Sequence, residues 1–159
     1  KKSDDTDGQT LSVPSYRGLE NPFGHVWSWT DGCKCNIQSA DAGGVSEFFV
    51  CTDPAKFQDS DYTDYEKRGE LPRNEGYVKI MMIGEYGENM PTAVGASSTT
   101  YFCDYYARGI PSSGSVTRGV LFGGSAINGA TAGFSYADTN NAASNTRAYF
   151  GSRLCFLPA

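Results

Sequence analysis

The chain has 159 residues, five cysteines and a formal net charge of −5 at pH 7, and this length allows one domain with a sizeable core. Its basic residues form no stripe that could meet a phosphate backbone, so we expect no nucleic-acid binding. No apolar run approaches the roughly 20 residues that cross a bilayer, so we expect no membrane insertion.

Aromatic residues and glycine are abundant, with ten Tyr, nine Phe and 19 Gly. Such a mixture favours short strands and loops over long amphipathic helices. We therefore predict one α+β domain with short antiparallel strands, long irregular loops and little helix.

The first fifteen residues are polar and include Asp4, Asp5 and Asp7, which predicts a linker or an edge segment ahead of a domain at 16–159. In the domain, residues 25–29 alternate so that Trp27 and Trp29 share one strand face. Asp31-Gly32 is then expected to make a turn.

Further strands are expected from apolar or aromatic runs at 45–51, 77–83, 101–106, 119–122 and 153–157. Small or polar residues predict loops at 91–100, 109–117 and 123–150. The charged stretch 53–75 is expected to be a solvated loop or a short helix. Its carboxylates are close enough in the chain to hold a structural calcium ion as an alternative: Asp59, Asp61, Asp64 and Glu66.

The cysteines are odd in number, so at least one thiol is free or paired with another molecule: Cys33, Cys35, Cys51, Cys103 and Cys155. Cys33-Lys34-Cys35 could form half of a soft-metal site. With no second close pair and only His25 as an imidazole ligand, reduced and half-buried thiols are the expected state. We therefore predict no metal site and no cofactor.

Residues 126–150, which we call the display segment, consist almost wholly of small, amide, hydroxyl and aromatic residues. Aromatic side chains offer contact area at a low entropy cost, and Ser, Asn and Gly adapt their hydrogen bonding, so this mixture is typical of binding surfaces. Some of its aromatic residues must fill the core, but we expect Tyr136 and Tyr149 to lie at the surface.

Two sequence motifs carry a resemblance to a known family. Gly18-Leu19 with Gly24-His25-Val26-Trp27-Ser28-Trp29 resembles the "GL…GNVWEW" pattern of the formylglycine-generating-enzyme-like branch of the C-type lectin fold. Phe122-Gly123-Gly124-Ser125-Ala126 with Gly151-Ser152-Arg153-Leu154 resembles the "RGGSW…GFR" ending of the same family. The resemblance implies a C-type lectin-like fold over residues 16–157.

Residues of the two motifs also have a physical interpretation. Gly123-Gly124 allows a positive φ or a close backbone approach before the display segment. Arg153 could hold the return of that segment through its forked hydrogen-bond donors.

The enzymes of this family place cysteines directly after Gly-Gly-Ser, where this chain has Ala126-Ile127-Asn128 and no cysteine before Cys155. A related iron-dependent branch needs several His ligands, and the chain has only His25. The resemblance therefore indicates the non-catalytic branch, the variable proteins of diversity-generating retroelements. Because the first motif lies in the second half of that family's domain, we expect the chain to be the C-terminal part of a longer protein.

In that family, adenine-directed mutagenesis diversifies codons near the end of the domain. The resemblance implies thirteen candidate ligand-binding positions: Ala126, Ile127, Asn128, Ala130, Thr131, Phe134, Tyr136, Asp138, Asn140, Thr146, Ala148, Tyr149 and Phe150. The implied partner is a cell-surface protein or glycan, contacted by several copies, such as a trimer, on a phage tail or a bacterial surface.

Three alternatives stay open. The chain could be a fixed structural or adhesin domain with an unvarying loop. It could be a copper- or calcium-dependent enzyme of the formylglycine-generating type, using Cys33, Cys35 or Cys103. It could bind sugar through calcium, although Glu20-Asn21-Pro22 has the ligand types in the wrong order for that chemistry.

Overall fold

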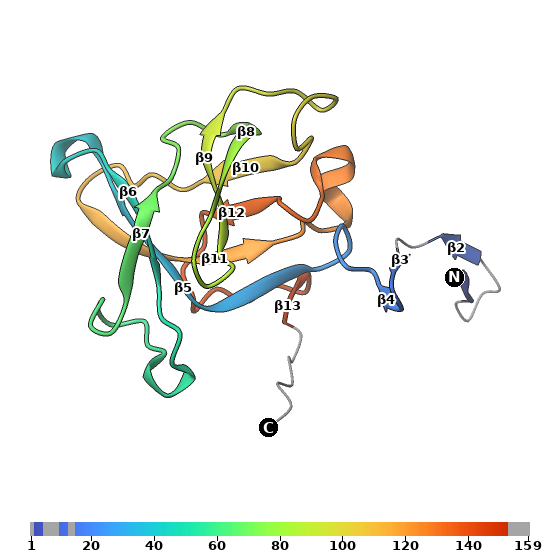
Figure 1. Ribbon diagram of the computed structural model, residues 1–159, viewed down its shortest axis with the longest axis horizontal. Coiled ribbons are helices and arrows are strands. Elements are labelled where there is room, and N and C mark those ends of the chain that lie inside the picture. The colour runs from blue at the N-terminus through green and yellow to red at the C-terminus, as the bar shows by residue number, and fades with distance from the viewer. Residues whose placement is uncertain (1, 5–9, 13–14, 153–159) are drawn as a thin grey trace.

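The computed structural model describes residues 2–4, 10–12 and 15–152, in which nine strands form a curved, barrel-like sheet (Figure 1). Its strands are β5 (Trp27–Gln38), β6 (Ser46–Val50), β7 (Glu66–Glu70), β8 (Gly76–Ile83), β9 (Asn89–Val94), β10 (Tyr105–Arg108), β11 (Ser115–Phe122), β12 (Ala137–Thr139) and β13 (Phe150–Gly151). Their order is β7-β6-β5-β11-β12-β10-β8-β9, and β13 pairs with β5 outside this path. The pairs are antiparallel except β10 with β12 and β13 with β5, which are parallel.

Helix in the described residues is limited to three short 3-10 turns, η1 (Ala40–Ala42), η2 (Pro54–Lys56) and η3 (Ala126–Thr131). The prediction of short strands with little helix is therefore confirmed. The α-helical part of the predicted α+β class is not present in the described part of the chain.

Near the N-terminus, two small hairpins precede the main sheet. β1 (Lys2–Asp4) pairs with β2 (Thr10–Ser12), and β3 (Ser15–Tyr16) pairs with β4 (Leu19–Glu20). Figure 1 shows both at one side of the molecule, apart from the large sheet.

The long strand β5 contributes to two hydrophobic cores because a bulge reverses its faces. Gly119 of β11 lies opposite Lys34, but Val120 lies opposite Thr30, so β5 carries three additional residues between them. An odd insertion moves the following side chains to the other face of the sheet. Trp27 and Trp29 consequently face one core, whereas Cys35 and Ile37, at the same parity, face the other.

The larger core lies inside the curved sheet and is built around Ile37, Phe48, Val78, Met90 and Tyr106. The smaller core consists of Trp27, Leu121 and Tyr136, with Trp29 and Phe150 packed against it. Central strand β11 joins them, since Val120 faces the first core and Leu121 the second. The predicted common face of Trp27 and Trp29 is confirmed.

The two ends of the sheet approach each other through side chains. Arg68 of β7 donates from Nε to Glu88 Oε1 at 2.6 Å, and Glu88 directly precedes β9. A Cβ at Gly69 would lie 2.9 Å from Met82 Sδ of β8. Among the described strands no backbone ladder joins β7 to β8 or β9, so this seam is closed by side chains alone.

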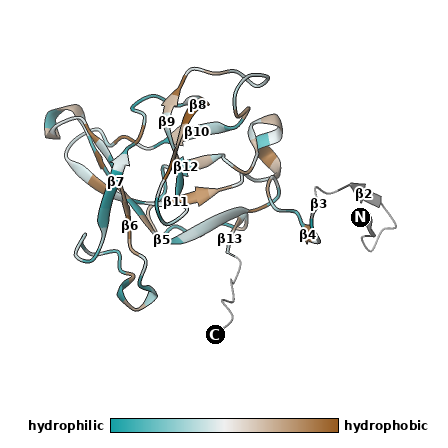
Figure 2. Ribbon diagram, viewed as in Figure 1, coloured by the Kyte–Doolittle hydropathy of each residue, from teal (hydrophilic) through white to brown (hydrophobic). Residues whose placement is uncertain are grey.

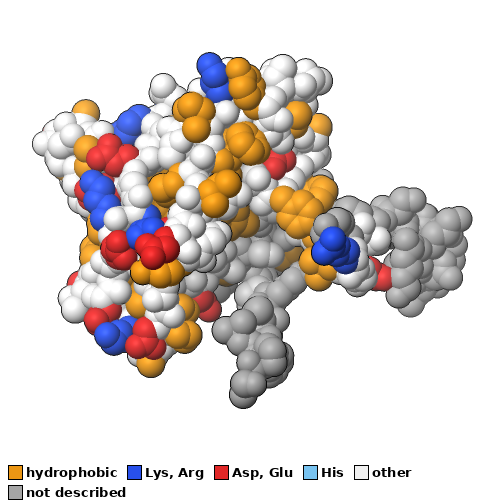
Figure 3. Space-filling view, viewed as in Figure 1, with side chains coloured by type: hydrophobic (Ala, Val, Ile, Leu, Met, Phe, Trp, Pro, Cys, Tyr) orange, Lys and Arg blue, Asp and Glu red, His pale blue; other side chains and the backbone are white. Residues whose placement is uncertain are grey.

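The two ends of the sheet differ in the hydropathy of their exposed side chains. Figure 2 shows β7 as a hydrophilic end strand, and acidic and basic side chains alternate along the same side in Figure 3. Hydrophobic side chains gather over the region of β8 and β9 in Figure 3, where Ile80 and Ile83 are exposed.

Several element predictions were wrong. Asp31-Gly32 is the bulge inside β5 and not a turn, because both flanking halves continue to pair with β11. The charged stretch 53–75 contains strand β7, and the predicted loop 91–100 begins within β9. The predicted strand 101–106 begins only at Tyr105. The strands predicted at 45–51, 77–83 and 119–122 are confirmed, and the one at 153–157 lies outside the described residues.

Candidate binding segment

The two sequence motifs lie side by side and hold the display segment at both ends. At its start, Gly24 N–H donates to Gly123 O at 2.9 Å, and Ala126 N–H donates to His25 O at 3.2 Å. At its end, Trp27 N–H donates to Tyr149 O at 2.9 Å, and β13 continues this pairing. All these contacts are between main-chain atoms, so they do not depend on which side chains the segment carries.

Gly123 and Gly124 have φ values of 94° and 77°, which confirms the predicted positive φ before the display segment. Space is also restricted at Gly124, where a Cβ would lie 2.8 Å from the Cβ of Ala132. The Gly-Gly pair thus turns the chain out of β11 into η3.

Within η3, Asn128 stabilises the turn. Its Oδ1 accepts hydrogen bonds from Ser125 N at 2.7 Å and from Ser125 Oγ at 2.9 Å. Thr131 Oγ1 donates to Asn128 O at 2.7 Å. Asn128 and Thr131, both half-buried candidates, therefore have structural roles in holding the turn.

Tyr136 was predicted at the surface, and this prediction was wrong. The side chain is only 6% exposed, with its ring edge-on to Trp27 at 4.6 Å and to Tyr105 at 5.9 Å between ring centroids. Burial raises the pKa of its hydroxyl to about 12. The reason is that Tyr136 leads into β12, whose neighbour β11 brings it over the smaller core.

Asp138 and Phe150 are half-buried. Asp138 accepts from Asn140 N at 2.6 Å and from Asn141 Nδ2 at 3.4 Å, and burial raises its pKa. The Phe150 ring lies edge-on to Trp29 at 5.6 Å. The side chains of Asp138 and Phe150 therefore make contacts inside the domain that help to hold the segment in place.

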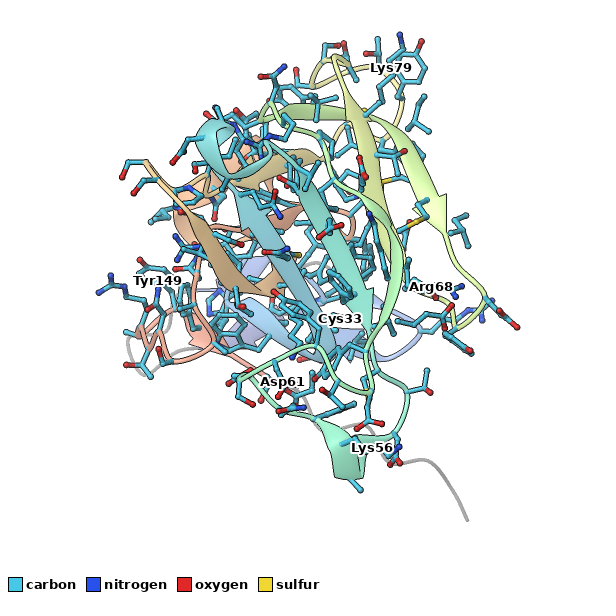
Figure 4. The ribbon with its side chains drawn as sticks, turned by 90° about the vertical axis from the view of Figure 1, so that its left-hand side faces the viewer. Cys33, Lys56, Asp61, Arg68, Lys79 and Tyr149 are labelled. Atoms are coloured by element: carbon cyan, nitrogen blue, oxygen red, sulfur yellow. The ribbon has the colours of Figure 1, made fainter. Side chains whose placement is uncertain are left out.

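The other candidate positions are exposed: Ala126, Ile127, Ala130, Phe134, Asn140, Thr146, Ala148 and Tyr149. Their apolar members are notable, because Ile127 is 83% exposed, Phe134 57% and Tyr149 40%. Phe134 rests against Phe23 at 5.0 Å, and Tyr149 against Phe150 at 5.1 Å. Figure 4 shows Tyr149 at the outer edge of the molecule, and its surface prediction is confirmed.

Sequence reasoning missed Asp104, which holds the middle of the segment from outside it. Its Oδ2 accepts from Ser135 N at 2.7 Å, and a Cβ at Gly133 would overlap its carboxylate. Burial raises the pKa of Asp104. The residue lies within the aromatic stretch 101–106, and no sequence pattern there predicts the contact.

The other residues that could act as nucleophiles or metal ligands do not come together as a site in the described part of the chain. The four described cysteines, Cys33, Cys35, Cys51 and Cys103, are unpaired. Burial raises the pKa values of Cys33 and Cys35, so both are protonated thiols at neutral pH. No group of three metal-ligating side chains occurs in the described ranges, and Arg153 and Cys155 lie outside them.

The acidic residues of 53–75 are occupied in separate contacts. Asp61 accepts from Thr63 N at 2.8 Å, Asp64 pairs with Lys56 at 2.9 Å, and Glu66 pairs with Arg68 at 2.7 Å. They do not converge on one point. In Figure 4, Asp61 lies close below the sheet, whereas Lys56 lies at the tip of η2.

In the part of the chain that the structure describes, no helix is long and apolar enough to cross a bilayer. Comparison with known proteins gives no match among protein-family models, curated proteins or solved structures. Function is therefore inferred from the residues of this chain.

Proposed function

We propose that the chain is a non-catalytic receptor-binding domain with a C-type lectin-like fold, related to the variable proteins of diversity-generating retroelements. The exposed side chains of the display segment would contact a cell-surface protein or glycan. The observation that carries the proposal is the main-chain anchoring at Gly123, Ala126 and Tyr149. A segment fixed in this way can change its exposed side chains while keeping its path.

The exposed apolar residues of the segment support a binding role. Ile127, Phe134 and Tyr149 expose apolar surface that a partner could cover. Binding free energy in protein interfaces is concentrated in a few such anchors, surrounded by adaptable polar residues. The neighbouring Asn140 and Thr146 supply polar groups of that kind.

A non-catalytic role is further supported by the burial of Cys33 and Cys35. Nucleophilic cysteines need a lowered pKa, whereas burial raises the pKa of Cys33 to about 11. We place the domain on a phage tail or a bacterial surface, in several copies such as a trimer. Multiple copies would raise the avidity of a weak single site.

Sequencing the 3′ end of the gene across a population of its source would test the proposal. We expect differences to cluster at the codons of Ile127, Phe134 and Tyr149 and of the other exposed positions, at sites where a nearby template copy has adenine. Tyr136 should not vary, because replacing a buried aromatic residue with a small one costs about 3–5 kcal/mol.

Two outcomes would contradict the proposal. Differences spread evenly over buried and exposed positions would show that variation is not directed to the side chains that can contact a ligand. An invariant segment with no template copy would leave a fixed adhesin or structural domain as the function.

A further inference from the structure

A groove of about 590 Å³ opens on the outer face of the sheet, between residues 57–65 and the later part of the display segment. Its floor is formed by β5 and β11, one wall by residues 57–65, and the other by residues 142–144 with Ser152. The volume lies in the range of small-molecule sites, about 300–1,000 Å³. None of its described lining residues is one of the thirteen candidate positions.

Two aromatic side chains of the groove are each seated on a glycine. A Cβ at Gly119 would lie 2.6 Å from Trp29 Cζ3, so the indole lies directly on the backbone of β11. A Cβ at Gly32 would lie 2.7 Å from Phe57 Cζ. Trp29 is half-buried and Phe57 is exposed, so both present ring surface to the groove.

The wall at 57–65 is held rigidly by Lys34, whose side chain is buried. Its ammonium donates to the main-chain oxygens of Gln58, at 2.8 Å, and Asp61. It also lies 3.7 Å from the ring centroid of Tyr65 and 4.8 Å from that of Tyr62. Burial lowers the pKa of Lys34, and these carbonyls and rings compensate its charge.

Tyr62 fixes the same wall to the floor. Its hydroxyl donates to Cys35 O at 3.2 Å and lies 2.9 Å from Thr117 Oγ1 of β11. A site whose walls are already fixed loses little conformational entropy when a ligand binds.

The polar groups along the groove are acceptors, neutral donors and two cationic side chains, those of Lys34 and Arg118. Asp31 and Asp59 contribute exposed carboxylates, and Gln58, Ser144 and Ser152 contribute an amide and two hydroxyls. The ammonium of Lys34 is already satisfied by carbonyl oxygens, whereas Arg118 Nε is buried without a hydrogen-bond partner among the described residues. Two carboxylates and two cationic groups balance in the groove, which favours a neutral ligand, and hydrogen-bonding groups lie next to aromatic surface.

We infer that this groove binds a neutral oligosaccharide directly, with no bridging metal ion. A sugar ring has an apolar C–H face, which suits the surfaces of Trp29 and Phe57. Its hydroxyls can donate to Asp31 and Asp59, giving charge-assisted hydrogen bonds. The site shares residues 142–144 with the display segment but none of its thirteen candidate positions, and it does not rest on the function proposed for them.

The two tryptophans allow a direct test by NMR. In ¹⁵N-labelled protein each gives one indole N–H signal, and only Trp29 lines the groove. The probes are cellobiose, maltose, lactose and N,N′-diacetylchitobiose, each up to on the order of 50 mM, well above a millimolar Kd. We expect a saturable shift of the Trp29 signal with at least one of them, unchanged by EDTA, while Trp27 stays in place.

Three variants locate the site. Ser144→Phe, at an exposed position in the groove, should abolish the shift, and Ser113→Phe, at an exposed serine outside it, should leave the shift unchanged. Asp59→Asn should weaken binding about tenfold by removing a charge-assisted acceptor. Ile127→Ala should have no effect on saccharide binding, which separates this result from the fate of the display segment.

The inference would be overturned if none of the four saccharides moves the Trp29 signal, if the shift survives Ser144→Phe, or if EDTA removes it. Glucuronic acid and a Lys/Arg-rich peptide serve as charged comparisons. Tighter binding of either one than of the neutral disaccharides would also overturn it.

Discussion

Cys33 combines a core position with a titratable group. Its side chain packs against the larger core, and burial raises the pKa of the thiol from 9.0 to about 11, with Glu88 and Asp31 adding to the effect. The thiol therefore stays protonated in the folded protein at pH values where it would ionise in the unfolded chain.

This difference predicts a loss of stability in alkali. Between about pH 9 and pH 11 the unfolded state binds fewer protons than the folded state, so the free energy of unfolding falls as the pH rises. Cys33 contributes at most about 1.4 kcal/mol per pH unit to that slope. Urea unfolding across this range, with a reductant, should give a shallower slope for Cys33→Ala than for the parent.

The slope of the variant should not vanish, because burial also raises the pKa values of Cys35 and Tyr136. Equal slopes for parent and variant would show that Cys33 titrates normally in the folded protein.

Burial of single residues was only partly predictable from the sequence. Tyr136 and Tyr149 are the same residue type in one polar stretch, yet one lies on Trp27 and the other is exposed. The sequence near each tyrosine does not differ in a way that reveals this. The difference comes from Trp27, a partner from a distant strand, and no local pattern encodes it.

At the scale of the element, the bulge in β5 depends on Gly32. Its φ of 75° favours glycine, and a Cβ there would lie 2.7 Å from Cys51 O as well as from the Phe57 ring. Gly114 has a similar φ of 71° but nothing within 4 Å of its would-be Cβ. Alanine substitutions at these two glycines therefore separate the cost of backbone strain from the cost of steric overlap.

We expect Gly114→Ala to lower the free energy of unfolding by about 1–2 kcal/mol, the cost of a left-handed conformation. Gly32→Ala should cost at least about 2 kcal/mol more, because a main-chain oxygen must also move. Urea unfolding of both variants measures the difference. Similar losses would show that the bulge has room for a methyl group.

The same bulge explains why the Asp31-Gly32 prediction failed. An Asp-Gly pair is typical of hairpin turns because glycine tolerates positive φ. Here the positive φ is used within a continuous strand, which keeps its pairing with β11 on both sides. Strands with clear apolar runs, such as β6 and β8, were predictable, whereas the charged β7 was not.

At the scale of the whole molecule, side chains join the ends of the sheet. Arg68 contacts Glu88, whose side chain is only 3% exposed, and Arg68 itself is largely covered. Lys67, next to it on β7, makes ion pairs with Glu47 and Glu70 at the surface. The two residues provide matched positions inside and outside the seam.

We expect Arg68→Ala to lower the urea midpoint clearly, because it leaves the Glu88 carboxylate covered and unpaired. Lys67→Ala should change the midpoint little, as exposed ion pairs usually contribute little. Arg68→Ala should also speed hydrogen exchange in β7 and β9 more than in β11. An equal effect of both substitutions would show that the seam does not depend on this pair.

The pairing of β13 with β5 has a consequence for how the domain is made. Phe150 pairs with Trp27, so the first long strand of the sheet receives its last partner from the end of the described chain. Contacts between such distant residues form slowly, because a large loop must close first. During synthesis Trp27 would stay uncovered until almost the whole domain has left the ribosome. A chain that stops before β12 would leave an aromatic, aggregation-prone surface exposed to solvent. Shortened forms of this protein should therefore aggregate or be degraded, and the display segment should be among the last parts to fold.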